Sequence, residues 1–162
     1  MAFTYDYPRP GLTTDAVVVR PEPQPQVLLV RRRGEPFKDM WALPGGFLDE
    51  HEDLDACVRR ELAEETGLTG VELHPLANFS RPGRDPRGWT VSAAYVGLAP
   101  AGAEPVAGDD AAEVRWFELA ALPPLAFDHA EIVAAALAWL HEHGSSKGVD
   151  PARLPPLAIT QG

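Results

Sequence analysis

The alternation of apolar and polar positions divides most of the chain into short β-branched runs separated by turns rich in proline and glycine. Runs at 13–20, "TTDAVVVR", and 26–33, "QVLLVRRR", flank the turn "PEPQPQ" and predict a β-hairpin. The stretch 41–47, "WALPGGF", predicts a short strand broken by a proline and two glycines. Three further strands are predicted at 71–80, 90–98 and 113–119.

Two other segments have the period of an amphipathic helix. Between Asp53 and Gly67, apolar residues recur every four positions, and these two residues suit the N-cap and the position after the helix. A second, alanine-rich helix is predicted over 128–143. Strands interleaved with two helices favour an α/β fold, a mixed sheet flanked by helices. We expect one domain over 1–143 and a proline-rich tail over 144–162.

Composition and charge narrow the function classes. The 162 residues are 45% apolar and 23% charged, which is ordinary for one globular domain. Lysine and arginine number 14 against 24 acidic residues, a net charge of −10, which disfavours nucleic acid and anionic membranes as partners. A phosphorylated ligand would therefore need a local cation, either arginine or metal. A single cysteine and the lack of a signal-like or membrane-spanning run predict a cytoplasmic protein.

Three glutamates crowd the end of the first predicted helix. Glu61, Glu64 and Glu65 are spaced three and four residues apart, so they project from one side and repel by ~0.2–0.5 kcal/mol per pair. Their place near the helix C-terminus adds an unfavourable dipole interaction. For the glutamates alone, a solvated acidic face explains the pattern. A hard divalent cation such as Mg²⁺, which prefers carboxylate oxygens, would relieve the repulsion.

The residues around these glutamates favour the cation. Gly46, five residues, Glu52, seven residues and then "RELAEETGL" (60–68) form a pattern of 23 residues. This pattern resembles the Nudix box at every fixed position, and the chain is identified as a member of the Nudix hydrolase family. The resemblance implies a Nudix-type α/β/α sandwich with a mixed central sheet, and hydrolysis of a diphosphate.

The resemblance also implies roles for individual residues. Glu61, Glu64 and Glu65 are expected to be catalytic and to bind the metal, Mg²⁺ or alternatively Mn²⁺, together with Gly45. Such a metal polarises the diphosphate and lowers the pKa of the attacking water. Glu52 is expected to reach Arg60 and hold loop and helix together as structural support.

Stretches outside the box point to a branch of the family. "EPFKDMWALPGGF", "RPGRDPRGWTVSAAYV" and "GDDAAEVRWFEL" resemble the branch of ADP-ribose pyrophosphatases and of sensor domains in NAD-metabolism regulators. Cleavage of ADP-ribose to AMP and ribose 5-phosphate is therefore the leading expectation, and such enzymes are frequently homodimers. The alternatives are a nucleoside triphosphate or dinucleotide substrate, and a non-catalytic ligand sensor. The complete box, the acidic charge and the short tail disfavour the sensor.

Substrate-binding candidates lie in two basic segments. Arg84 and Arg87 belong to a loop that is rich in arginine within an acidic protein, and guanidinium groups bind phosphate or stack on adenine. Arg33, with Arg31, is a second candidate on the predicted strand that ends at 33, although strand-edge solubility explains these arginines equally well.

Two further roles remain open from the sequence. Phe37 and Trp41, with Trp89, are candidates for stacking on a base, or alternatively core residues. A general base is sought in Glu113, Asp109 or Asp110, which alternatively cap or end a strand. His129 at the start of the last helix is expected to be structural.

Overall fold

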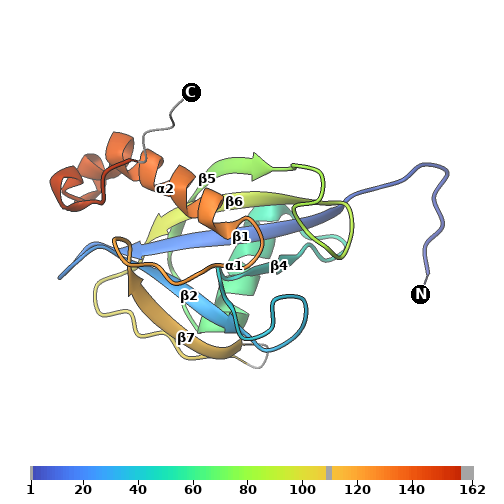
Figure 1. Ribbon diagram of the computed structural model, residues 1–162, viewed down its shortest axis with the longest axis horizontal. Helices are drawn as coiled ribbons and strands as arrows, with labels where there is room; N and C mark the ends of the chain where they lie inside the picture. Colours follow the sequence, from blue (N-terminus) through green and yellow to red (C-terminus); the bar gives the residue numbers. More distant parts are fainter. Residues whose placement is uncertain (1, 109–110, 158–162) are drawn as a thin grey trace.

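The computed structural model describes residues 2–108 and 111–157 and contains one seven-stranded sheet with a helix on each face (Figure 1). The strands are Gly11–Arg20 (β1), Gln26–Arg32 (β2), Trp41–Ala42 (β3), Gly45–Phe47 (β4), Glu72–Phe79 (β5), Thr90–Leu98 (β6) and Ala111–Glu118 (β7). The helices are Leu54–Thr66 (α1) and His129–His143 (α2), followed by the short 3₁₀ helices Gly144–Lys147 (η1) and Pro151–Arg153 (η2).

The sheet is mixed, as predicted. Its main path runs β3-β2-β1-β6-β5, with β4 paired to β1 and β7 to β2. β1 and β6 run parallel and the other pairs are antiparallel. Alternation along β1 divides the core: Val17 and Val19 pack toward α2, whereas Ala16 and Val18 pack toward α1. The predicted α/β/α sandwich is therefore confirmed.

One edge of β1 is shared by two strands that diverge from each other. β4 pairs with the first half of β1, Asp15 facing Gly45, whereas β2 pairs with its end, Val19 facing Val27. The opposite edge of β1 is fully paired with β6. The predicted hairpin of β1 and β2 thus forms only near its turn, and the two strands separate beyond it.

Both ends of α1 are capped as the sequence predicts. Asp53 Oδ1 accepts a hydrogen bond from the Ala56 N–H at 2.8 Å, and Gly67 adopts the left-handed region with φ 71°. The loop before β7 covers the last carbonyls of α1: Gly108 N–H donates to Glu65 O at 3.0 Å. Such capping fixes the end of the helix that carries the glutamates.

The segment before β1 extends away from the sheet (Figure 1), whereas the segment after α2 packs against the core. In the described residues, the arm before β1 extends away from the sheet (Figure 1), and its aromatic contacts join Phe3 to Tyr5 and Arg9 to Tyr5. The homodimer expected from the family resemblance stays a prediction. In the predicted tail, Val149 and Leu154 are buried against the core of α2.

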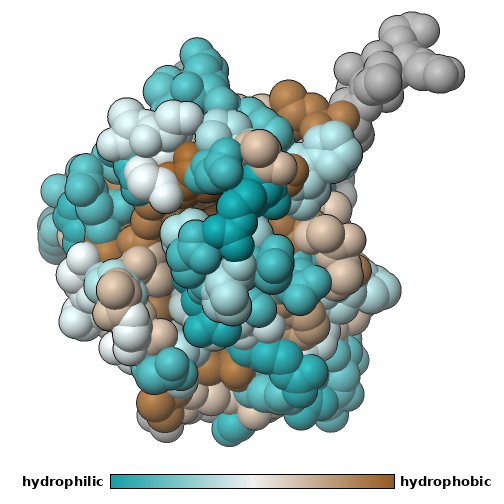
Figure 2. Space-filling view, turned by 90° about the vertical axis from the view of Figure 1, so that its left-hand side faces the viewer, coloured by the Kyte–Doolittle hydropathy of each residue, from teal (hydrophilic) through white to brown (hydrophobic). Residues whose placement is uncertain are grey.

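Hydrophilic and hydrophobic residues are interspersed over the face seen in Figure 2, and they do not gather in one large apolar patch. Across the residues that the structure describes, no helix combines the length and apolar character needed to cross a membrane.

Candidate active site

A cleft of about 580 Å³ lies where β2 and β4 diverge from each other along one edge of β1. Its lining comes from the ends of these strands, from α1, from the loop between β5 and β6, and from the turn that leads into α2. Acidic side chains in the lining include Asp15, Glu61 and Glu65, and basic ones include Arg32 and Arg87. The cleft therefore contains both signs of charge within one concave surface.

The acidic part of the cleft is built by α1 and the glycines of β4. Gly45 N–H donates to Glu65 Oε2 at 3.0 Å. A Cβ atom at Gly46 would lie 2.4–2.6 Å from the Glu61 carboxylate atoms, so only glycine allows this close approach. Glu64 is not one of the described residues that line the cleft, and its side chain is 57% exposed. The three predicted metal-binding glutamates thus occupy two environments, a half-buried pair and an exposed neighbour.

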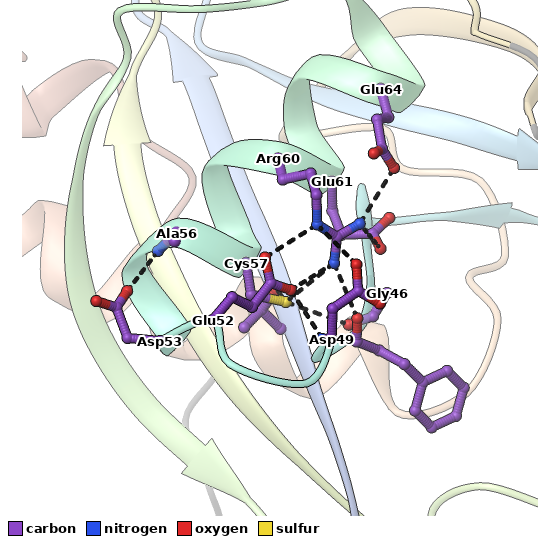
Figure 3. Close-up of polar contacts among 11 residues, drawn as sticks. Gly46, Asp49, Glu52, Asp53, Ala56, Cys57, Arg60, Glu61 and Glu64 are labelled. Atoms are coloured by element: carbon purple, nitrogen blue, oxygen red, sulfur yellow. Dashed lines mark hydrogen bonds and ion pairs between the residues drawn. The ribbon is translucent and has the colours of Figure 1, made fainter. Parts of the chain in front are cut away.

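Arg60 links the loop before α1 to the glutamates (Figure 3). Its guanidinium donates to both carboxylate oxygens of Glu52, at 3.0 and 2.6 Å, so the predicted pairing is present. The same guanidinium donates from Nη1 to Glu61 Oε1 at 2.9 Å and to Glu64 Oε2 at 3.2 Å. The hydrogen bonds from Arg60 lower the pKa of Glu52 to about 2. Arg60 also lies 3.4 Å from Asp49 Oδ2, so it is a counter-charge shared by four carboxylates.

Burial disfavours the charged forms of Glu61 and Glu65 when no cation is bound. Burial raises the pKa of Glu65 to about 8, and the nearby Glu61 and Asp15 add to the rise against the hydrogen bond from Gly45. Burial likewise raises the pKa of Glu61, although Arg60 opposes the rise. A cation in the cleft would favour the charged forms of both.

The donor atoms present fit a hard divalent cation, since carboxylate and backbone carbonyl oxygens are its preferred ligands. The cleft is lined by Glu61, Glu65 and Gly45. Glu64 directly precedes Glu65 on α1. Among the described residues, no three His, Cys, Asp or Glu side chains already converge as a metal-binding group. The arrangement supplies donors of the right chemistry without a completed coordination shell.

The basic part of the cleft gathers around Phe127. The guanidinium carbons of Arg32 and Arg87 lie 4.9 and 5.2 Å from the centre of the Phe127 ring. Arg87 also lies 4.9 Å from the ring of Phe47. Burial lowers the pKa of Arg32, and the positive charge of Arg87 lowers it further. Two cations held this close favour an anionic ligand between or beside them.

The predicted arginines differ in their surroundings. Arg87 is 40% exposed at the cleft and pairs with the buried Asp85 at 2.8 Å. Arg33 lines the cleft and donates to the Ala111 carbonyl at 3.0 Å. Arg84 also borders the cleft, but its side chain is only 4% exposed, and Nε and Nη2 both donate to Asp128, at 2.9 and 2.6 Å. One edge of the Arg84 guanidinium is thus used in an internal ion pair, and its expected contact with phosphate stays a prediction.

The predicted aromatic stackers lie away from the cleft lining described by the structure. Phe37 packs edge-on behind Phe127, and Trp41 packs edge-on against Phe117 in the core, both with ring centres 4.7 Å apart. Trp89 is exposed at the end of the loop before β6. The aromatic rings that do line the cleft are those of Phe47 and Phe127.

Of the predicted general bases, the described structure shows only Glu113, and it does not bring Glu113 to the cleft. Glu113 lies on β7, where its carboxylate forms ion pairs with Arg31, at 3.5 Å, and with Arg115, and it does not line the cleft. Strand pairing of β7 with β2 explains the first contact, because Glu113 faces Arg31 directly. Asp109 and Asp110 lie outside the described residues.

Several cleft residues are not predicted as site residues from the sequence, among them Asp15, Arg32, Phe47 and Phe127. Asp15 had a signal, since it is a lone carboxylate in a run that is otherwise apolar or hydroxylated. Strand alternation predicts that Arg32 faces away from Arg31 and Arg33, but the pairing of β2 with β7 shifts register between Arg31 and Arg32. Phe127 has a φ of 53° in the turn before α2, a conformation that the sequence gives no means to foresee.

The sequence of the chain is similar to those of known proteins. The NUDIX domain family matches residues 9–140. The ADP-ribose pyrophosphatase of Methanocaldococcus jannaschii is 41% identical over 133 residues, which are 82% of this chain and 76% of that protein. The ADPR responsive transcriptional repressor NtrR of Acinetobacter baylyi is 36% identical over 157 residues, 94% of this chain, which spans only 63% of that repressor.

A solved structure gives a similar result. The NUDIX domain of Shewanella oneidensis NrtR, crystallised with ADP ribose, superposes with a TM-score of 0.78 at 36% identity. The match covers 84% of this chain and 94% of that domain. These similar proteins thus include a pyrophosphatase, an ADPR responsive repressor and a domain that was crystallised with ADP ribose.

Proposed function

The chain belongs to the Nudix family of pyrophosphohydrolases, and we propose that it hydrolyses a nucleoside diphosphate linked to a second group, with ADP-ribose as the leading substrate. The products would be AMP and ribose 5-phosphate, because water adds across the phosphoanhydride bond. The likeness to the pyrophosphatase of M. jannaschii and to an ADP-ribose-bound NrtR domain supports this choice.

The observation that carries the proposal is that one cleft has an acidic side and a basic side. Glu61 and Glu65 face it from α1, whereas Arg32 and Arg87 face it from β2 and from the loop between β5 and β6. A diphosphate bridged by a cation needs both kinds of group, carboxylates for the cation and guanidiniums for oxygens that the cation leaves uncovered. A cleft with carboxylates alone could bind a cation, but it would offer no group for the phosphate oxygens of a substrate.

The cation that we propose is Mg²⁺, with Mn²⁺ as a substitute, held by Glu61, Glu64, Glu65 and the carbonyl of Gly45. When bound, such an ion polarises the diphosphate and lowers the pKa of a water molecule. The chain itself binds the anionic substrate through Arg87 and Arg32, and it keeps the glutamates in place through Arg60. Phe47 and Phe127 offer flat apolar surfaces beside these guanidiniums for the planar or sugar parts of the ligand.

A sensor function is the second candidate, because the A. baylyi relative is an ADPR responsive repressor and the cleft would bind such a ligand in either case. A sensor needs affinity without turnover. The two functions therefore predict the same ligand and differ in the fate of its phosphoanhydride bond.

Incubation of the purified protein with Mg²⁺ and a panel of ADP-ribose, a dinucleotide and a nucleoside triphosphate tests the proposal. We expect AMP and ribose 5-phosphate from ADP-ribose, detected by chromatography, with ¹⁸O from labelled water in one product. Faster release of products from the triphosphate would instead support the alternative substrate class. Calorimetric binding of ADP-ribose without any product would favour the sensor.

A further inference from the structure

The first turn of α2 reaches the acidic part of the cleft through a buried histidine. His129 is only 5% exposed. Its Nδ1 accepts a hydrogen bond from the Leu43 N–H at 2.9 Å, and its Nε2 lies 3.4 Å from Asp15 Oδ1. Because Nδ1 is the acceptor, the ring proton lies on Nε2 and faces the carboxylate. The ring thus joins the backbone before β4 to a carboxylate on β1.

The backbone that His129 contacts is held at three successive residues by three different elements. Leu43 is bound by His129 of α2, the carbonyl of Pro44 accepts from the Ala16 N–H of β1 at 2.9 Å, and Gly45 N–H donates to Glu65 of α1 at 3.0 Å. The position of Glu65 therefore depends on where this segment lies. His129 is the only one of the three anchors that comes from the α2 side of the sheet.

Asp15 is fixed from the same side. Ser92 Oγ donates to Asp15 Oδ2, and Nε2 of His129 faces the other oxygen. Asp15 pairs with Gly45 across β1 and β4, and a Cβ atom at Gly45 would lie 2.6 Å from Asp15 Oδ1. Asp15 lines the cleft although only 6% of its surface is exposed.

We propose that His129 is a positioning residue of the active site, which sets the register of Leu43 to Gly45 and the direction of the Asp15 carboxylate, and thereby the place of Glu65. The proposal rests on the proposed function in taking the acidic side of the cleft as the cation-binding side. It predicts an effect on cation affinity and on kcat, with a smaller effect on KM, because Arg32 and Arg87 lie on the other side of the cleft.

Two conservative variants separate the two contacts of the ring. In His129→Asn the amide oxygen stands near the place of Nδ1 and still accepts from Leu43. In His129→Gln the amide nitrogen stands near the place of Nε2 and still faces Asp15, but the acceptor for Leu43 is lost. His143→Asn, a change at an exposed histidine of the same helix, is the matched control.

Manganese binding is measured first by calorimetry, without nucleotide, and kcat and KM for ADP-ribose follow. We expect His129→Gln to weaken Mn²⁺ binding and kcat by ~10–100-fold, the usual range for residues that orient metal ligands. His129→Asn should restore most of both values, and His143→Asn should match the wild type. Folded His129→Gln protein with wild-type Mn²⁺ affinity and kcat would overturn the proposal.

A second measurement uses the wild-type protein and decides the matter if the variants do not fold. Titration with Mg²⁺ should shift the ¹⁵N resonances of His129 and the amide signals of Leu43 and Gly45 together. Shifts confined to Gly45, with His129 unmoved, would overturn the positioning role. The Mn²⁺ calorimetry and the Mg²⁺ titration do not require turnover. A protein that binds Mn²⁺ but cleaves no diphosphate would therefore refute the proposed function, and these two measurements would still decide the role of His129.

Discussion

Glu65 accepts a hydrogen bond from the backbone N–H of Gly45 at 3.0 Å. The carboxylate of Glu65, which is proposed to bind the cation, therefore also joins α1 to β4. The contact offsets only part of the burial of this carboxylate, whose pKa is raised to about 8. A neighbouring carboxylate, that of Glu61, strengthens the rise. Glu65 should therefore contribute to the pH dependence of the stability of the metal-free protein.

For metal-free protein we predict that the free energy of unfolding falls as pH rises from about 4.5 to about 8. In this window the folded state keeps a proton on Glu65 that the unfolded chain has released, so rising pH favours unfolding. One pKa unit corresponds to about 1.4 kcal/mol, so even half of this shift would be worth about 2 kcal/mol. Glu65→Gln, which cannot ionise, should lose this slope and be more stable at pH 8.

Thermal unfolding in a chelator across pH 4.5–8.5 measures the effect. Glu64→Gln is the control, because the side chain of Glu64 is mostly exposed, and it should keep the wild-type slope. Equal slopes for wild type and Glu65→Gln would show that Glu65 is ionised in the folded protein at neutral pH.

Glu64→Gln should act on turnover rather than on folding. Glu64 is exposed, and it shares the Nη1 group of Arg60 with the like-charged Glu61. Removal of its charge should therefore leave the Tm of the metal-free protein unchanged or slightly higher. A metal ion contributes several kcal/mol to catalysis, and about 1.4 kcal/mol is tenfold in rate. We therefore expect kcat to fall by about 100-fold or more at saturating Mg²⁺. A variant with wild-type kcat and the same Mg²⁺ requirement would remove Glu64 from the metal-binding set.

The Nudix-box helix was predictable because its information is local. Apolar residues every four positions, the cap at Asp53 and the glycine at Gly67 are properties of one short segment, and the structure reproduces each of them. The pairing of Glu52 with Arg60 follows from the same segment, since both residues flank one loop and one helix.

The basic side of the cleft was not predictable in the same way. The place of Arg32 depends on a register shift between β2 and β7, two strands far apart in the sequence. Phe127 depends on the backbone of a turn before α2, and Arg84 on Asp128, which lies 44 residues later. The composition of the loop shows that its arginines are unusual in an acidic protein. Only the tertiary structure shows that Arg87 is exposed at the cleft and that Arg84 forms a buried ion pair with Asp128.

Arg84 and Arg87 should therefore respond differently to alanine. Arg84→Ala leaves Asp128 buried without its partner, so we expect a loss of ~3–5 kcal/mol of stability. Arg87→Ala also takes a guanidinium away from the buried Asp85, but Asp85 keeps the hydrogen bond from the backbone N–H of residue 87, so we expect a smaller loss of stability than for Arg84→Ala. A lost charged hydrogen bond of ~1.5–3 kcal/mol should raise KM about tenfold or more.

Urea unfolding and steady-state kinetics on the two variants, side by side, measure this contrast. A stable Arg84→Ala protein with a raised KM would restore Arg84 to the substrate site. An unchanged KM for Arg87→Ala would take Arg87 out of it.

Gly108 gives the last prediction, because it touches the end of α1 where the glutamates lie. A Cβ atom at this position would stand 1.7 Å from the Glu64 carbonyl oxygen, a backbone atom that no side-chain rotation can move away. Gly108→Ala must displace the loop before β7 and weaken the hydrogen bond from its N–H to Glu65 O. We expect ~1–3 kcal/mol of destabilisation, as for other overpacked sites, together with weaker Mn²⁺ binding.

Chemical unfolding and calorimetric Mn²⁺ titration measure both effects, with Ala107→Ser as the control at the exposed neighbouring position. If the loop serves only to connect β6 and β7, Gly108→Ala should lose stability and keep its cation affinity. Loss of both, with Ala107→Ser like the wild type, would show that the capped end of α1 holds the glutamates in place, since the substitution adds one methyl group and removes no charge.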